Sequence, residues 1–272
     1  MMQELEMDWN FVSNYLITRL REYIQASGKK GGVIGLSGGI DSSVVLKLLT
    51  QATRNVHVLL MPSESTPAKD IQDSYTMLRS VGAPYSEIKI DDLVKSFSSK
   101  VDSDDKVLVG NIKARVRMTL LYAYAQKLDY LVIGTGDKSE ILLGYFTKYG
   151  DGGVDVLPIG DLYKTQVKKL AQQIGIPKNI IEKPSSPALW EGQTAEGELG
   201  IDYESVDKIL YLLYEKFMDP QKVAQEVKTS RENVDKVIRL VRNNEHKRKM
   251  PEIFKISGRT VGSDWRYPRI WE

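Results

Sequence analysis

The sequence predicts an α/β protein: a doubly wound, mainly parallel sheet with helices on both faces, followed by further helices. Between residues 30 and 165, short apolar runs alternate with helical patterns, an order typical of parallel strands joined by helices. Over residues 166–250 the patterns are helical only. No internal repeat and no Pro/Gly/Ser-rich linker divides the 272 residues, so we expect one domain over residues 1–272.

The first expected element is a helix within residues 6–27, because apolar side chains from Trp9 to Ile24 recur at roughly helical spacing. Four apolar runs then predict buried strands, and helical patterns lie between them. The strands are expected at 33–36, 56–60, 85–90 and 130–133, and the helices near 42–52, 67–81, 91–99 and 106–128. In such a sheet, ligands bind at the carboxyl ends of the strands.

The C-terminal part is expected to contain helices near 164–175, 178–182, 202–217, 220–227 and 230–245. Asp202, Asp219 and Ser230 are candidate N-caps, and Pro220 suits a first helical position. The tail over residues 251–272 is expected to be either a docked segment or a disordered end. It contains the aromatic residues Trp265, Tyr267 and Trp271.

Composition excludes several classes of protein. With 38 Lys+Arg against 36 Asp+Glu and a net charge of +2, the chain gives no reason to expect a nucleic-acid partner. No apolar run approaches the ~18 residues of a membrane helix, and the acidic start lacks the features of a signal peptide, so we expect a cytoplasmic protein with no membrane partner. The absence of cysteine excludes disulfides, Cys-type zinc sites and thiolate nucleophiles.

A Ser/Gly-rich turn, SGGIDS at residues 37–42, follows the first expected strand and leads into a helix. Gly38 and Gly39 allow backbone N–H groups to converge on one point, where the helix N-terminus adds partial positive charge, so the turn predicts a phosphate site. Asp41 would repel a phosphate unless a divalent cation lay between them, so the turn also implies Mg²⁺. A strand–helix turn capped by Asp or Ser is the alternative, but it does not explain the whole run.

Residues 37–42 resemble the SGGxDS pyrophosphate loop of the N-type ATP pyrophosphatases, which cleave ATP to AMP and pyrophosphate. This resemblance implies the fold of the adenine nucleotide alpha hydrolase-like proteins. The superfamily includes NAD synthetase, GMP synthetase and several enzymes that thiolate tRNA. The thiolating branches generally use cysteines, which this chain lacks.

Three further motifs resemble those of the NAD synthetase family: GNIKARVRM at 110–118, Gly-Thr at 134–135 followed by Glu140, and TKYGDGGVD within 144–158. Further matches follow in the family's order at Lys164, 189–194, 198–200 and 245–248. The resemblance covers about residues 30–250. It points to the ammonia-dependent branch, because the glutamine-dependent form carries an amidase domain with a cysteine nucleophile and this chain has no cysteine.

The resemblance implies a ligase that forms a C–N bond by amidating deamido-NAD with ammonia to give NAD. ATP is the expected co-substrate and Mg²⁺ the expected cofactor; the nicotinate carboxylate is adenylated, and AMP and pyrophosphate are released. The family's dinucleotide site lies between two subunits, which implies a homodimer. Apolar side chains of the helix over 112–125 suit an interface, although burial within one subunit is the alternative.

The resemblance also assigns site residues. Asp41 and Glu140 are the expected Mg²⁺ ligands, and with Lys164 they form the expected catalytic group. ATP contacts are carried over to Gly35, Leu36, Ser37, Gly38, Gly39, Ile40, Asp41, Ser42, Met61, Thr135, Lys164 and Ser186. Deamido-NAD contacts are carried over to Asn111, Arg115, Lys148, Asp155, His246 and Lys247.

From the residues alone, several assignments have alternatives. Glu140 could be a solvated helix carboxylate, Lys164 a surface lysine near a helix cap, and Met61 a core residue. Ser186 is the weaker match, because Ser-Ser-Pro-Ala at 185–188 departs from the family's Pro-Ser/Thr-Ala-Asp.

Two other functions remain open. The chain could be the ATP pyrophosphatase subunit of another amidotransferase, similar to GMP synthetase, but the motifs at 110–118 and 144–158 argue against it. It could also be a non-catalytic adenine-nucleotide-binding protein. The presence of both Asp41 and Glu140 argues against that, since binding alone would tolerate the loss of a metal ligand.

Overall fold

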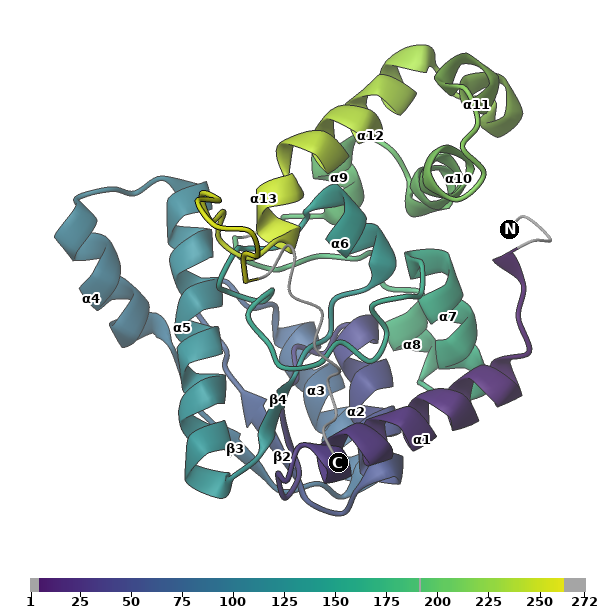
Figure 1. Ribbon diagram of the computed structural model, residues 1–272. Helices are drawn as coiled ribbons and strands as arrows, with labels where there is room; N and C mark the ends of the chain where they lie inside the picture. Colours follow the sequence, from purple (N-terminus) through teal and green to yellow (C-terminus); the bar gives the residue numbers. More distant parts are fainter. Residues whose placement is uncertain (1–4, 191, 262–272) are drawn as a thin grey trace.

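The computed structural model describes residues 5–190 and 192–261 (Figure 1). Within these residues, the sheet is parallel throughout. Its strands are β1 (Gly32–Gly35), β2 (Val56–Leu60), β3 (Tyr85–Glu87) and β4 (Leu131–Ile133), in the order β3-β2-β1-β4. All three neighbouring pairs run parallel, with Val33 opposite both His57 and Val132. Val156 adds a single parallel bridge to Ile133. The predicted mainly parallel sheet is confirmed.

Helices cover both faces of the sheet, as a doubly wound fold requires (Figure 1). One face carries α1 (Trp9–Ala26), α2 (Ile40–Ala52), α3 (Ala68–Val81), α7 (Lys164–Gln173) and α8 (Lys178–Ile181); the other carries α4 (Asp91–Val101) and α5 (Lys106–Leu128). Because side chains alternate along a strand, Val33 and Val132 pack toward α5, whereas Ile34 and Ile133 pack toward α2. Two cores therefore lie back to back across the sheet.

The predicted elements differ from the observed ones mainly at their ends. β3 ends at Glu87 rather than at residue 90, because Ile90 is already the N-cap of α4. Asp91 and Asp92 occupy the first turn of that helix, where acidic side chains favour a helix start. Three helices, α6 (Lys138–Leu143), α9 (Ala195–Leu199) and α13 (Glu245–Arg248), were not predicted, since each is too short to show a helical repeat.

Beyond α9 the chain forms a helical unit of α10 (Tyr203–Tyr214), α11 (Pro220–Val227), α12 (Arg231–Asn243) and α13 (Glu245–Arg248). The expected N-caps Asp202, Asp219 and Ser230 are confirmed, since each side-chain oxygen accepts a backbone N–H two or three residues on. The unit packs on α6 and on the start of α7 through a third core that includes Leu143 and Tyr163. It thereby contacts two helices that carry site residues.

The end of the chain is irregular where it is described. Residues 249–261 contain no helix or strand. The aromatic residues Trp265, Tyr267 and Trp271 lie outside the described residues. No helix in the described ranges combines the length and the apolar character that a membrane span needs.

Candidate active site

A cavity of about 730 Å³ opens at the carboxyl ends of β1, β2 and β4. This is the edge of the sheet at which the sequence predicts ligand binding. The cavity is also lined by residues of α3, α5 and α6 and by residues 183–190 and 192–195. The predicted site residues that line the cavity are Gly35, Leu36, Ser37, Gly39, Ile40, Asp41, Ser42, Met61, Asn111, Thr135, Glu140, Ser186 and Lys247.

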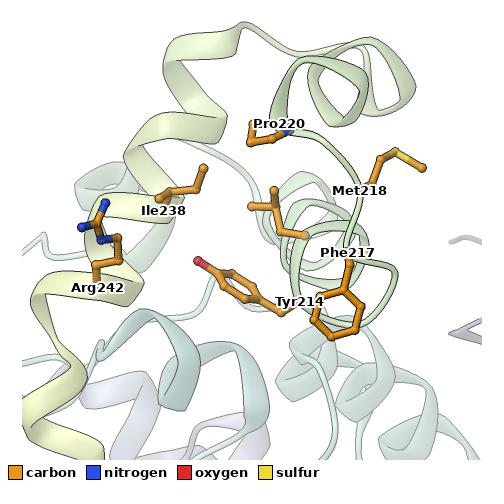
Figure 2. A pocket seen from close by; sticks show the side chains of 7 residues that line it. Tyr214, Phe217, Met218, Pro220, Ile238 and Arg242 are labelled. Carbon is orange, nitrogen blue, oxygen red and sulfur yellow. The ribbon is translucent and has the colours of Figure 1, made fainter.

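A smaller hollow of about 380 Å³ lies among α10, α11 and α12. Figure 2 shows its apolar lining, which includes Tyr214, Phe217, Met218 and Ile238. Of the described residues that line it, only Arg242 is charged, and none is a predicted site residue. The candidate chemistry therefore belongs to the larger cavity.

The predicted phosphate loop joins β1 to α2 and forms part of the cavity wall. Gly38 has φ +75°, and a Cβ there would lie 2.1 Å from the carbonyl oxygen of Asp70, so no other residue fits this turn without displacing α3. Ser42 Oγ and Ser43 Oγ both donate to the carbonyl oxygen of Gly39, over 3.1 Å and 2.8 Å. These bonds fix the first turn of α2, whose backbone N–H groups can bind an anion.

Lys164 joins the carboxylates of three separate residues at the base of the cavity. Its Nζ lies 2.8 Å from Asp41 Oδ2, 2.8 Å from Asp137 Oδ2 and 2.9 Å from Glu140 Oε1. The ammonium group donates hydrogen bonds to Asp41 and Glu140, and its contact with Asp137 is an ion pair. Lys164 and Asp137 are fully buried, whereas Asp41 and Glu140 reach the cavity. The structure thus brings together the three predicted catalytic residues and places the buried Asp137 against Lys164.

The charges of this cluster are strongly coupled. Burial disfavours the ammonium of Lys164, but the carboxylates of Asp137, Asp41 and Glu140 outweigh that effect and hold its pKa well above the ordinary value. Burial raises the pKa of the Glu140 carboxyl, and the lysine opposes this shift only in part. Burial likewise raises the pKa of Asp137. With three carboxylates and one lysine, the cluster can accommodate a further positive charge.

The cavity side of this cluster fits a divalent cation. Asp41 Oδ1 is buried and has no hydrogen-bond partner among the described residues, so a carboxylate oxygen is left for a ligand. Carboxylate oxygens are ligands that Mg²⁺ prefers, and it is commonly held by one or two of them together with substrate phosphates. No group of three or more His, Cys, Asp or Glu side chains in the described part of the chain is arranged to hold a metal by itself. Phosphate and water oxygens would therefore complete the coordination.

The residues predicted to bind deamido-NAD fall into two groups. Asn111 and Lys247 line the cavity; Asn111 Oδ1 accepts from Thr147 Oγ1 over 2.7 Å, and Lys247 Nζ donates to the carbonyl oxygen of Phe146 over 2.9 Å. Burial lowers the pKa of Lys247.

The other four residues of this set are not part of the cavity lining. Arg115 Nε donates to the carbonyl oxygen of Lys148 over 3.3 Å, and Lys148 Nζ lies 3.5 Å from His246 Nδ1. Asp155 accepts from the hydroxyl of Tyr122 over 3.0 Å. Arg115, Lys148 and His246 therefore form a separate basic group.

Two residues that the sequence analysis missed hold the cluster in place. Asp137 is the N-cap of α6 and forms a capping box with Glu140, a pattern that the spacing Asp-x-x-Glu could have indicated. Asp207 of α10 is fully buried and accepts from Ser139 Oγ over 2.5 Å and from the backbone N–H of Thr165 over 2.8 Å. No sequence signal connects Asp207 with Ser139 and Thr165, which lie 68 and 42 positions earlier in the chain.

The parallel sheet, the phosphate loop and the carboxylate–lysine cluster define a nucleotide-binding α/β protein of the ATP pyrophosphatase type. Within this class the chain belongs to the NAD synthase family, whose family model matches residues 12–251.

The relatives agree with this assignment. The NH(3)-dependent NAD(+) synthetase of Sulfurisphaera tokodaii is 60% identical over 271 residues, which cover 99% of this chain and 97% of that protein. Among solved structures, the NMN synthetase of Francisella tularensis has a TM-score of 0.83 and 32% identity, with coverage of 92% of this chain and 100% of that one. The NH3-dependent NAD synthetase of Campylobacter jejuni has a TM-score of 0.79 and 31% identity, again covering 92% and 100%.

Proposed function

We propose that this protein forms NAD from deamido-NAD, ATP and ammonia, with release of AMP and pyrophosphate. The main support for the proposal is that Asp41, Glu140 and Lys164 lie together beside a phosphate loop. In addition, an NH(3)-dependent NAD(+) synthetase matches the chain over 99% of its length. Members of this family use ATP, and the cavity offers a site for its phosphates.

The chemistry requires activation of a carboxylate, which is a poor acyl donor. An oxygen of the nicotinate carboxylate attacks the α-phosphorus of ATP, a new P–O bond forms, and the bond to the β-phosphate breaks with loss of pyrophosphate. The nitrogen of ammonia then attacks the acyl carbon, the C–O bond to AMP breaks, and the nitrogen loses a proton. Catalysis of such transfers consists mainly of positioning and charge stabilisation.

The residues of the cluster suit these two tasks. We assign the serine hydroxyls and backbone N–H groups of residues 37–42 to the phosphates of ATP. Asp41 and Glu140 would hold Mg²⁺, which when bound neutralises charge on the phosphates. Lys164 lies behind both carboxylates and keeps them in place, and we assign it a contact to ATP that replaces one of its carboxylate partners.

The nitrogen donor is assigned to free ammonia. The sequence contains no cysteine, so it offers no thiol nucleophile to release ammonia from glutamine.

We further propose that the dinucleotide site is completed by a second copy of the chain. Arg115, Lys148 and His246 lie together outside the cavity lining, and the cations of Arg115 and Lys148 suit the phosphates of deamido-NAD. The molar mass in solution, measured by light scattering, tests for the homodimer.

The helix proposed for this interface, α5, divides its apolar side chains between the cavity and the surface. Met118 and Leu121 line the cavity, so those two belong to the site within one subunit. Tyr122 is exposed and therefore available to a partner.

A second substrate is favoured by one comparison. The Francisella tularensis protein with a TM-score of 0.83 is an NMN synthetase, so amidation of nicotinate mononucleotide is the alternative reaction at the same site. Both reactions use the same nicotinate carboxylate and ATP, and they differ only in the size of the acyl substrate.

The proposal is tested by incubating the protein with ATP and Mg²⁺ in four mixtures: ammonium with deamido-NAD, glutamine with deamido-NAD, ammonium with nicotinate mononucleotide, and ammonium with XMP. We expect rapid NAD formation in the first mixture and little product in the others. Faster turnover of the mononucleotide would change the assigned substrate. Product only from XMP would contradict the proposed function.

A further inference from the structure

Lys183 occupies an unassigned position beside the phosphate loop. Its Nζ donates to the carbonyl oxygen of Gly38 over 2.6 Å, to Asp70 Oδ1 over 2.7 Å and to Asp73 Oδ2 over 2.9 Å. The side chain is 16% exposed, and three acceptors use all three of its donors. The ammonium of Lys183 is therefore held by the protein, and one of its partners is the backbone of the loop itself.

The bond to Gly38 fixes the orientation of one peptide unit in the loop. A trans peptide is planar, so its C=O and the following N–H point in opposite directions. Lys183 holds the Gly38 carbonyl on the α3 side, and the N–H of Gly39 points the other way, where it donates over 3.3 Å to Ser37 Oγ in the cavity wall. Rotation of this peptide would turn a carbonyl oxygen, which repels phosphate, toward the cavity.

Lys183 also balances two acidic side chains close to the phosphate loop. Asp70 and Asp73 of α3 are 14% and 5% exposed, and an uncompensated pair of carboxylates here would oppose anion binding. Asn179 Nδ2 donates to the other oxygen of Asp73 over 2.7 Å. The lysine thus joins the phosphate loop, the start of α3 and the segment that follows α8.

The segment after Lys183 forms another wall of the same cavity. Pro184 follows directly and restricts the backbone of Lys183 to extended conformations. Pro184, Ser185 and Ser186 all line the cavity. Lys183 therefore connects two walls of the same cavity.

We propose that Lys183 is a positioning residue for ATP: it keeps the Gly39 N–H turned toward the phosphates and joins the phosphate loop to the wall over 184–186. This role deepens the function proposed above and rests on the assignment of ATP to the cavity.

The test compares four variants by kinetics and by calorimetric titration with ATP. Lys183→Met removes the donors. Asp73→Asn combined with Lys183→Met removes one positive and one negative charge, so it tests the same role without leaving two carboxylates unpaired. Lys183→Arg retains donors and positive charge. Lys178→Met is the matched control, because Lys178 lies on the neighbouring α8 with 85% of its side chain exposed.

We expect the charge-balanced double variant to raise the KM and the dissociation constant of ATP roughly tenfold or more, since the lysine supplies a charge-assisted hydrogen bond. The KM of deamido-NAD should stay within about twofold of wild type, Lys183→Arg should recover part of the loss, and Lys178→Met should match wild type.

An unchanged dissociation constant for ATP in the folded double variant would overturn the proposal. Equal increases in the KM of ATP and deamido-NAD would overturn it as well, because they would indicate general loosening of the site. If the wild-type protein formed no NAD, the proposed reaction would fail, but ATP binding by calorimetry would still decide the role of Lys183.

Discussion

Lys164 Nζ lies 2.8 Å from Asp41 Oδ2, although the two residues are 123 positions apart in the chain. Each stands at the start of a helix, Asp41 in α2 and Lys164 in α7, so the contact joins two helix N-termini at the base of the cavity. The lysine is fully buried and the carboxylate reaches the cavity. Lys164 thus holds the Asp41 side chain from the protein interior, while Asp41 itself faces the cavity.

Replacement of Lys164 by Met should lower the free energy of unfolding by about 3–5 kcal/mol, the usual cost of leaving buried charges without a partner. Asp41, Asp137 and Glu140 would face one another without the ammonium group. Urea unfolding monitored by circular dichroism measures the change. Adding Asp137→Asn should recover part of the stability without recovering NAD formation. A Lys164→Met protein as stable as wild type would show that the cluster is not coupled as described.

Asp41→Asn and Glu140→Gln should each lower kcat at least about a hundredfold, because each removes a charge that stabilises the transferring phosphates through Mg²⁺. The unfolding midpoint should stay close to wild type, since both changes reduce the excess of negative charge around Lys164. Asp161→Asn is the matched control, because 98% of that side chain is exposed. Normal Mg²⁺-dependent turnover in either site variant would remove that residue from the proposed ligands.

The buried Asp207 should make stability depend on pH. Burial raises the pKa of its carboxyl from 3.8 to about 7, although Ser139 and Thr165 donate hydrogen bonds that oppose this shift. Between these pH values the folded protein binds a proton that the unfolded chain has lost, so stability falls as pH rises. Asp207→Asn lacks this contribution. The stability of wild type relative to Asp207→Asn should therefore decrease from about pH 4 to about pH 7 in urea titrations.

Asp202→Asn is the control, because the contribution of Asp202 to stability should change with pH in the opposite direction. Burial opposes ionisation of Asp202, but the N–H groups of its helix cap outweigh burial and lower its pKa. Its stabilising contribution should be constant at neutral pH and should be lost only as pH falls below about 4. A stability difference between wild type and Asp207→Asn that did not change with pH would contradict the environment assigned to Asp207.

Gly150→Ala should disturb the turn that carries Thr147. A Cβ at Gly150 would lie 2.9 Å from the Cβ atoms of both Ala114 and Thr147, so α5 or the turn must shift. Overpacking of this kind usually costs about 1–3 kcal/mol. Because Thr147 donates to Asn111, we also expect a higher KM for deamido-NAD. Gly258→Ala is the control, since a Cβ there meets no atom within 4 Å. Unchanged stability and KM in Gly150→Ala would argue against this packing.

The regular part of the fold could be predicted because local pattern and burial agree. Residues 56–60 form β2 within the predicted bounds, since their apolar side chains are buried on both sides of the sheet. The N-caps Asp202, Asp219 and Ser230 were likewise predicted from local chemistry. Helix α6 was missed because six residues show too little periodicity.

Site residues could be predicted only where they belong to a sequence motif. Asp41 and Glu140 stand in motifs, and the structure brings both to the same cavity. Asp137, Lys183 and Asp207 act through contacts between distant segments, for example over 145 positions from Lys183 to Gly38. Such contacts depend on the tertiary fold, so local patterns do not reveal them. The ligand roles of all the predicted site residues, Asp41 and Glu140 included, stay predictions.

Adenylation of the nicotinate carboxylate is the step on which the proposed function depends. The most direct measurement uses deamido-NAD with oxygen-18 in its carboxylate, together with ATP, Mg²⁺ and ammonium, and mass spectrometry of the products. We predict that one labelled oxygen appears in AMP for each NAD formed and that pyrophosphate stays unlabelled, because the carboxylate oxygen that attacks the α-phosphorus leaves with AMP. Label in inorganic phosphate, with ADP as the second product, would contradict the account.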